Sequence, residues 1–249
     1  LPIGFGSVTS IGGVGHYCVF HKLRAFKDTL EDEELKKRVD VLYDYWQDND
    51  VKSIYCQDVL NDTTTGRFID CKYPFMATAR LSGMMLDYKK LVRLGVNGLI
   101  DLIEKNESNT FMEACLKTMY LFKDVIRRQI ELVKDAIEKT QDEQRLKDLH
   151  LMKEDLVYIL NHKPATFHQA LQLFWLYALC AGCINYGRMD IVLGPYLKHD
   201  IDTGLIDEDE AYRYVKSLWT MIENRRTTVN GRIIVGGKGR ENVEAADLF

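Results

Sequence analysis

The sequence lacks the features that mark membrane, nucleic-acid-binding and secreted proteins. No stretch approaches eighteen unbroken apolar residues, so no membrane span is predicted. The formal net charge is only −4 over 249 residues, and a broad basic face for nucleic acid is not expected. Residues 1–13 carry no basic region of the kind that opens a signal peptide. The six scattered cysteines are typical of reduced thiols, and we expect a cytoplasmic location.

Prolines are few, and no serine- or glycine-rich linker interrupts the chain. Only four prolines occur, and no repeat or low-complexity segment is present. Because 46% of the residues are hydrophobic, the chain can bury a sizeable core as one large domain or two small ones.

Apolar residues recur at three- and four-residue spacing over much of the chain, which predicts amphipathic helices. The predicted helices cover residues 31–48, 87–104, 110–139 and 142–160. The polar segment KTQDEQ separates the last two, so we expect an antiparallel pair. Short strands are predicted at 52–60 and 67–71. Gly95 and Gly98 would weaken an isolated helix by about 1 kcal/mol each, and we expect them to permit close packing instead.

Helix and strand signals alternate in the later part of the chain. Thr166 and Gln169 form the pattern of a capping box ahead of a strongly apolar helix. The segment GRMDIVLG, residues 187–194, predicts a short buried strand that turns at Gly-Pro. A helix then begins near Asp207, and GRIIVGG predicts another strand. This order indicates an α/β layer or barrel.

Several chemical motifs are present, and most have a simpler structural explanation. Cys180 and Cys183 have the spacing of a metal or redox pair, but no second pair follows, so buried structural thiols are favoured. His16 and His21 have no fixed carboxylate partner, and we expect no metal ligation there. His168 lies inside the capping box and is expected to face solvent. The sequence therefore predicts no metal site.

Arg188 and Asp190 carry opposite charges at one end of the predicted strand. Residues two apart on a strand point to the same face, so both side chains would lie together. A buried charge without a partner is costly, which favours a structural ion pair over a direct catalytic role. His199 and Asp200 are expected on the turn that follows.

A longer pattern runs through this part of the chain. A Pro-x-x-Phe-x-x-Ala-Leu-Gln helix leads to Gly-Arg-x-Asp, then to Pro-Tyr, an Asp-x-x-x-Gly turn and an acidic helix ending in tryptophan. The positions are Pro164, Phe167, Ala170, Leu171, Gln172, Gly187, Arg188, Asp190, Pro195, Tyr196, Asp200, Gly204 and Trp219. In this order they resemble the pyruvate formate-lyase domain of glycyl radical enzymes. Matches at DYKKLVRLGVNGLIDLIE, TFMEACLKTM and GRIIVGGKGRENVEAADLF extend the resemblance from about residue 80 to the end.

The resemblance implies an α/β fold in which residues 1–249 are a partial domain, a helix-rich part of a ten-stranded α/β barrel. In this family a separate radical-SAM activase installs a glycyl radical near the C-terminus. The radical passes to a cysteine inside the barrel, and the thiyl takes hydrogen from a small polar substrate. The implied reactions cleave a C–C or C–heteroatom bond, as in formate acetyltransferases and dehydratases. The resemblance also implies a homodimer at full length and no bound cofactor.

The sequence departs from the family pattern in its catalytic segments. It contains no Arg-Val-x-Gly-Tyr radical segment and no Gly-Cys-x-Glu-like loop, so no catalytic residue is expected in this fragment. We expect other polypeptide to supply the remainder of the barrel, and predict no radical turnover by residues 1–249 alone. The alternative is a non-catalytic helical module or accessory subunit that kept the packing and lost the chemistry.

The resemblance also indicates which residues face the substrate pocket. Relatives carry a histidine or an arginine a few residues before Asp-Tyr, whereas ARLSGMMLDY has neither at that position, which argues against pyruvate as the substrate. By position, the expected substrate-binding residues are Arg80, Ser82, Gly83, Asn230 and Arg232. Plain packing within a barrel would explain the same residues equally well.

Overall fold

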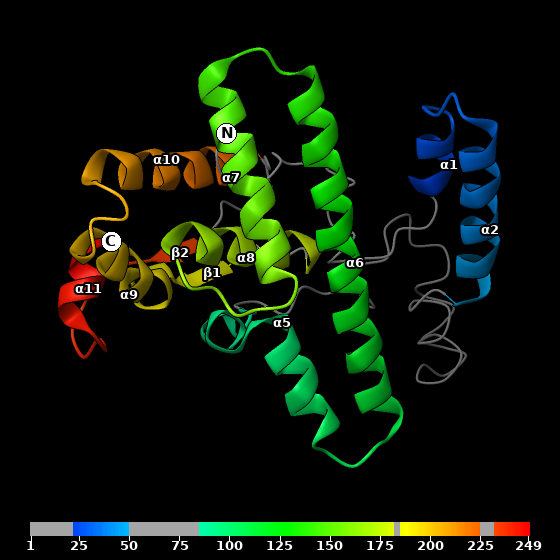
Figure 1. The fold of residues 1–249 in the computed structure, drawn as a ribbon. Helices are drawn as coiled ribbons and strands as arrows, with labels where there is room; N and C mark the ends of the chain where they lie inside the picture. Colours follow the sequence, from blue (N-terminus) through cyan, green and yellow to red (C-terminus); the bar gives the residue numbers. More distant parts are fainter. Residues whose placement is uncertain (1–21, 50–84, 182–184, 225–231) are drawn as a thin grey trace. The chain divides into compact units, whose positions relative to one another are not determined.

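The computed structural model describes residues 22–49, 85–181, 185–224 and 232–249 (Figure 1). The chain divides into two compact units, and each is described by itself. One unit comprises residues 11–83, and the other comprises residues 1–10 and 84–249. The strands predicted at 52–60 and 67–71 lie outside the described residues.

The described part of the smaller unit is a pair of helices, α1 (Lys22–Lys27) and α2 (Glu33–Asn49). Asp32 caps α2 by accepting a hydrogen bond of 2.8 Å from the backbone N–H of Glu34. The Nζ of Lys27 lies 2.7 Å from the carboxylate of Asp40 and joins the two helices. The helix predicted at 31–48 is therefore confirmed.

The larger unit is built mainly of helices, and its strands are short (Figure 1). The helices are α5 (Tyr88–Glu104), α6 (Thr110–Lys139), α7 (Glu143–Ile159), α8 (Phe167–Cys180), α9 (Met189–Asp202), α10 (Glu208–Asn224) and α11 (Val243–Leu248). The strands are β1 (Asn185–Arg188) and β2 (Arg232–Ile234). The predicted helices at 87–104, 110–139 and 142–160 are confirmed to within one residue.

Polar side chains fix where most of these helices begin. In each case a side-chain oxygen just before the helix accepts a hydrogen bond from the N–H three residues later, which satisfies a backbone donor that the helix leaves free. The capping residues are Asp87, Asn109, Asp142, Thr166 and Asp207. The predicted starts near Thr166 and Asp207 are thereby confirmed.

Helix α8 separates two groups of buried apolar side chains. The helical cluster lies among α5, α6, α7 and one side of α8, and α6 and α7 run antiparallel beside each other (Figure 1). Its fully buried members include Ile126, Val133, Leu149, Met152, Leu156, Ile159 and Leu173. The strand cluster lies among the other side of α8, β1, α9 and α10. Its members include Phe167, Phe174, Trp175, Tyr186, Met189, Leu193 and Leu218.

Because α8 serves both clusters, it is apolar almost all round, as its sequence predicts. Leu173 and Leu176 belong to the helical cluster, whereas Phe174 and Trp175, beside them in sequence, belong to the strand cluster. The ring of Trp175 stacks over Tyr186 of β1 at 6.5 Å between centroids. The helix therefore couples the long helices to the strands.

The segment 187–194 differs from the strand that its sequence predicts. Strand β1 ends at Arg188, and the rest of the segment opens α9. Gly194 and Pro195 lie inside α9, and a Cβ at Gly194 would stand 2.5 Å from the carbonyl oxygen of Ala245 in α11. The apolar side chains of the run are buried in the strand cluster, and α11 packs closely on α9 at Gly194. A short buried run does not distinguish a strand from a helix.

Strands β1 and β2 pair in parallel. Asn185 lies opposite Arg232, Gly187 opposite Ile233, and Arg188 opposite Ile234. The strand predicted from GRIIVGG is thus confirmed. Within the described ranges the sheet has these two strands, and helices alternate with them along the chain.

A kink in α5 depends on Gly95. Its φ of +68° lies outside the helical region, and a Cβ there would stand 2.8 Å from the Cα of Lys163. The close packing predicted for this glycine is confirmed, whereas a Cβ at Gly98 would approach only Leu94 of the same helix. Beside the kink, the carbonyl of Val92 accepts a hydrogen bond of 2.9 Å from the hydroxyl of Tyr196 in α9.

Candidate functional site

The candidate site lies at the carboxyl ends of β1 and β2. Ligands of parallel sheets bind in the crevice outside these ends. Here β1 runs directly into α9, and β2 runs into a segment that we call the glycine loop, residues 235–239 with the sequence VGGKG. Both segments bring polar groups to the same edge.

Arg188 and Asp190 form an ion pair across the start of α9. The Nε and Nη2 of Arg188 donate hydrogen bonds of 3.0 and 2.8 Å to the two carboxylate oxygens of Asp190. Asp190 is fully buried, and the side chain of Arg188 is 29% exposed. The two residues meet because α9 begins between them, not because they share a strand face as the sequence predicts.

The same ion pair binds both the N–H and the carbonyl of Gly236. The N–H of Gly236 donates a 2.9 Å hydrogen bond to Oδ2 of Asp190, and Nη2 of Arg188 donates a 3.0 Å bond to the carbonyl of Gly236. The N–H of Ile191 donates a further bond of 2.9 Å to Oδ1 of Asp190. Burial alone would raise the pKa of Asp190, but the bonds from Arg188, Gly236 and Ile191 together lower it.

The glycine loop has a backbone that favours glycine at three positions. The φ angles of Gly236, Gly237 and Gly239 are +74°, +91° and +72°. No atom of the described residues lies within 4 Å of where a Cβ would stand at any of the three. The conformation therefore reflects the path of the loop, and packing against the described residues does not require these glycines.

The chain just before α5 reaches the same edge of the sheet. Gly187 in β1 has a φ of +60°, and a Cβ there would stand 2.1 Å from the sulfur of Met85. Tyr186 beside it is buried against Phe174 and Trp175. Met85 thus covers the strand at the residue that precedes Arg188.

Most of the predicted substrate-binding residues cannot be placed against this edge. Arg80, Ser82, Gly83 and Asn230 lie outside the described residues. Arg232 opens β2 and is exposed, at the opposite end of the strand pair from Arg188. Their role in substrate binding therefore stays a prediction.

His168 is buried, which corrects the expectation that it faces solvent. Its Nδ1 makes a short contact with the carboxylate of Asp155 in α7, and its ring packs 4.6 Å from that of Tyr214 in α10. Gln169 donates a 3.0 Å hydrogen bond to the same carboxylate. The sequence of α8 is apolar almost all round, and this feature could have predicted the burial of His168. In such a helix the polar residues of the first turn also face neighbouring elements.

Asp200 also differs from expectation, since it lies in the last turn of α9 and is buried. Its Oδ2 accepts a 2.6 Å hydrogen bond from the N–H of Phe167, the first residue of α8. His199 contacts the other carboxylate oxygen at 3.0 Å. Asp200 therefore ties α9 to the start of α8, a contact between residues 33 apart that local sequence patterns do not reveal.

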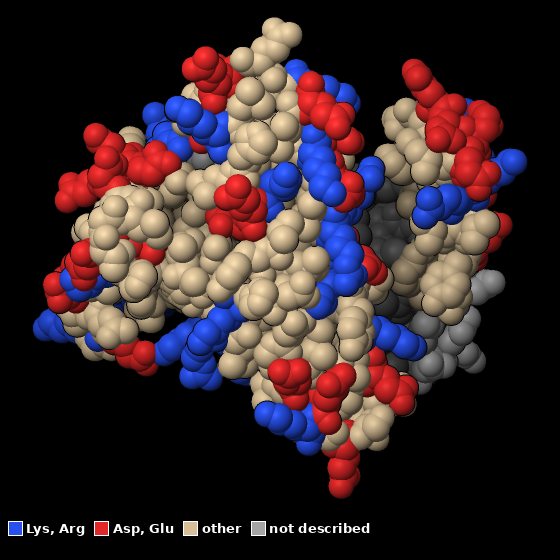
Figure 2. All heavy atoms as spheres, in the orientation of Figure 1, with Lys and Arg blue, Asp and Glu red and all other residues tan. Residues whose placement is uncertain are grey.

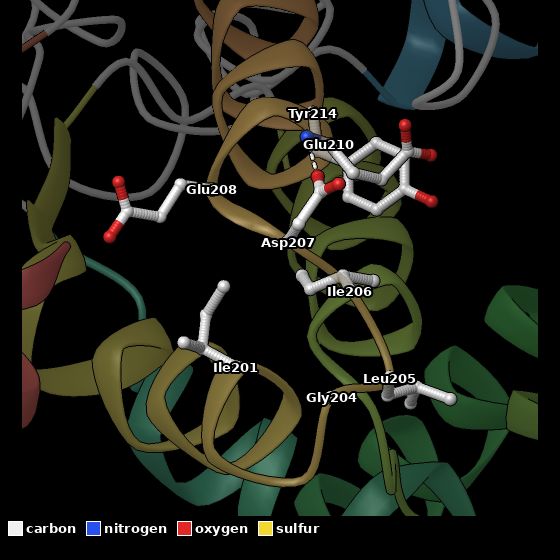
Figure 3. Close-up of a pocket in the computed structure, with 8 residues that line it drawn as sticks. All are labelled: Ile201, Gly204, Leu205, Ile206, Asp207, Glu208, Glu210 and Tyr214. Carbon is white, nitrogen blue, oxygen red and sulfur yellow. Dashed lines mark hydrogen bonds between the residues drawn. The ribbon is translucent and has the colours of Figure 1, made fainter.

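A hollow of about 740 Å³ lies where α9 is followed by α10 (Figure 3). Ile201 and Ile206 point into the space between the helices, and Asp207 turns back to cap α10 (Figure 3). Glu210 on its rim is held by Arg213 at 2.5 Å. Because Asp207 and Glu210 already have structural partners, we place the candidate site at the strand edge and not in this hollow.

Within the described ranges, no group of three or more histidine, cysteine, aspartate or glutamate side chains could hold a metal ion. Cys180 ends α8, where the residue is exposed although burial of its thiol raises the pKa of that group to about 11. Cys183 lies outside the described residues, so the expectation of two buried thiols stays a prediction. None of the described helices has the length and apolar character that a membrane crossing requires. On the face shown in Figure 2, acidic and basic side chains are interspersed.

The family model for pyruvate formate lyase-like proteins matches residues 16–244. The chain belongs to this family. The resemblance to glycyl radical enzymes inferred from the sequence is therefore confirmed at the level of the family.

Curated relatives of this family member include dehydratases. The chain is 25% identical to (2S)-3-sulfopropanediol dehydratase of Klebsiella oxytoca, over 88% of the chain and 31% of the relative. It is 28% identical to trans-4-hydroxy-L-proline dehydratase of Clostridioides difficile, over 56% of the chain and 19% of the relative. The chain thus spans between a fifth and a third of these relatives.

Solved structures of the family show the same fold. A structure on 1,2-propanediol dehydration in Roseburia inulinivorans aligns over 92% of the chain and 33% of its own, with a TM-score of 0.68 and 18% identity. The glycerol-bound, B12-independent glycerol dehydratase of Clostridium butyricum aligns over 90% of the chain and 35% of its own, with a TM-score of 0.65 and 19% identity. The helix-rich arrangement described here is thus one portion of the fold of glycyl radical enzymes.

Proposed function

We propose that the complete gene product is a glycyl radical enzyme that eliminates a group from a small polar metabolite by cleaving a C–heteroatom bond. The observation that carries this proposal is the family match over residues 16–244. The relatives named above are dehydratases, and an isethionate sulfite-lyase of Nitratidesulfovibrio vulgaris is also similar, at 24% identity over 53% of the chain. These names favour elimination over the acetyl transfer that the sequence also left open.

In this proposal, residues 1–249 supply part of the wall of the reaction chamber. The apolar strand cluster keeps water from one side of β1, and exclusion of water protects a reactive radical from side reactions. The polar strand edge would face the substrate side. Other polypeptide would supply the cysteine that abstracts a hydrogen atom and the glycine that stores the radical, after activation by a radical-SAM enzyme.

The assembly and location follow the same reasoning. We propose that the complete protein is a homodimer in the cytoplasm, as the family resemblance implies. We also propose that its source is an anaerobe, since a stored glycyl radical must be kept from oxygen.

Electron paramagnetic resonance tests the proposed function directly. The complete gene product is incubated without oxygen with its radical-SAM activase, and then with glycerol, propane-1,2-diol, trans-4-hydroxy-L-proline or isethionate. We expect a glycyl doublet and turnover of at least one compound. Residues 1–249 alone should give no doublet under the same conditions. A complete protein without a doublet would favour the accessory-subunit alternative.

A further inference from the structure

The ion pair of Arg188 and Asp190 binds both backbone polar groups of one residue, the N–H and the carbonyl of Gly236. Nη2 of Arg188 donates to both Asp190 and the carbonyl of Gly236, and Oδ2 of Asp190 accepts from both Arg188 and the N–H of Gly236. The three residues thus form a closed ring of hydrogen bonds. This ring fixes the start of the glycine loop against the start of α9.

A second arginine holds the next residue of the loop. Nε of Arg240 donates a 2.8 Å hydrogen bond to the carbonyl of Gly237, and its guanidinium lies 2.5 Å from the carboxylate of Asp247. The carbonyl groups of two successive glycines are therefore occupied by guanidinium groups. The N–H groups of Gly237, Lys238 and Gly239 donate no hydrogen bond to any of the described residues.

With respect to the described residues, this pattern leaves the loop with unpaired donors and open space. Successive backbone N–H groups in turns can form concavities that bind anionic oxygen atoms. The Cβ positions of the three glycines are open within the described part of the chain, so a small ligand could approach the backbone closely. The loop also follows the carboxyl end of β2, where ligands of parallel strands bind.

We propose that Arg188 and Asp190 are positioning residues, which hold the glycine loop so that its free N–H groups contact an oxygen atom of the substrate. This inference rests on the proposed function for the identity of the reaction. Its structural part, the dependence of the loop on the ion pair, stands separately. Neither side chain needs to touch the substrate or the radical.

The first test measures the loop without any radical chemistry. Hydrogen–deuterium exchange of the peptide covering residues 235–240 is compared between the unactivated complete protein and its Arg188→Lys variant. Lysine keeps the charge but loses the planar fork that reaches both Asp190 and Gly236. We expect exchange of the Gly236 amide, whose N–H donates to Asp190, to be about tenfold faster, because loss of the bonds from Arg188 favours local opening of the loop.

Arg213 provides a matched control. It is a partly exposed arginine that binds carboxylates, at 2.7 Å to Asp148 and 2.5 Å to Glu210, but it makes no hydrogen bond to the loop. The Arg213→Lys variant should show a similar loss of thermal stability with unchanged exchange of residues 235–240. Equal exchange of the Gly236 amide in the wild type and the Arg188→Lys variant would overturn the proposal.

The second test separates positioning from stability in the activated enzyme. For Arg188→Lys and Asp190→Asn at equal radical content, we expect kcat/KM to fall about ten- to a hundredfold, chiefly through KM, since small misplacements of binding groups are costly. Kinetics like those of Arg213→Lys would identify a purely structural pair. If the wild type forms no radical, the proposed function fails, while the exchange measurement still decides whether the pair holds the loop.

Discussion

The helical cluster and the strand edge are held together by different means. The helical cluster buries aliphatic side chains such as Leu149 and Leu156, which have no polar group to satisfy. The strand edge buries the carboxylate of Asp190, and the last turn of α9 buries that of Asp200, and each is held by a specific donor from elsewhere in the chain. Apolar packing tolerates exchange for side chains of equal volume, whereas a buried charge requires its partners.

This difference indicates where sequence change is tolerated. Many combinations of apolar side chains can pack the helical cluster. The strand edge, in contrast, needs particular polar residues at particular positions, because each buried polar group requires its partner. The comparison therefore predicts larger and more specific losses at the strand edge than in the helical cluster, and negligible losses at exposed ion pairs.

The largest loss is expected for Asp190→Ala. The variant leaves the guanidinium of Arg188 and the N–H of Gly236 without their acceptor, and breaking a buried pair costs about 3–5 kcal/mol. Urea unfolding followed by circular dichroism measures the change. The matched control is Asp124→Ala, which removes an exposed partner of Arg127. A loss below about 0.5 kcal/mol for Asp190→Ala would show that its pair behaves like an exposed one.

In the helical cluster, Leu156→Ala should lower the free energy of unfolding by about 2–5 kcal/mol, because it leaves a cavity. Leu156 is 1% exposed and is surrounded by apolar side chains. Leu156→Met, which nearly conserves volume, should cost less than about 1.5 kcal/mol in the same urea titration. Similar losses for both substitutions would contradict the tolerant packing assigned to this cluster.

Gly95→Ala tests the kink of α5, which supplies residues to both clusters. The positive φ and the approach to Lys163 should together cost about 1–3 kcal/mol or slightly more. Gly204 has the same φ of +68° but open space around its Cβ position, so Gly204→Ala isolates the effect of the backbone angle. Thermal unfolding should show a greater loss of stability for Gly95→Ala than for Gly204→Ala. Equal losses would show that the close approach of Gly95 to Lys163 does not contribute.

The dependence of stability on pH should report on Asp190. Its pKa is lowered in the folded protein, so the pair stabilises the fold above the ordinary value of 3.8 and loses this contribution as pH falls through the folded pKa. The difference in unfolding free energy between the wild type and Asp190→Asn should therefore be constant near neutral pH and shrink in acid. A difference that grows on acidification has the wrong sign for this account.

The smallest effect is expected for Arg127→Ala on α6. Arg127 and Asp124 are more than half exposed, although their charged atoms lie 2.5 Å apart. Solvent screens such a pair, so the unfolding free energy should change by less than about 0.5 kcal/mol. A loss comparable to that of Asp190→Ala would mean that burial does not separate the two ion pairs.

The helices could be predicted from the sequence because their signals are local. The apolar spacing of 110–139 and the cap at Asn109 together define α6 within a few residues. The same holds for the start of α8 at Thr166. Each of these features depends on residues three or four apart, which a single sequence displays directly.

The strand edge could be predicted only in part. Arg188 and Asp190 could be identified as partners, but their third partner, Gly236, lies 46 residues away from Asp190. The burial of His168 depends on Asp155 in another helix. The apolar run after Arg188 packs on distant elements, and Gly194 within it approaches Ala245 of α11. Contacts between distant segments, which local patterns do not contain, decided each of these outcomes.

A crystal structure of the complete gene product tests the central claim most directly. The account predicts that further strands continue the sheet beyond β1 and β2, and that the glycine loop and Arg188 lie at the edge of an enclosed chamber. A self-contained helical bundle, with the β1–β2 pair on its outer surface and no strand beside it, would contradict the claim.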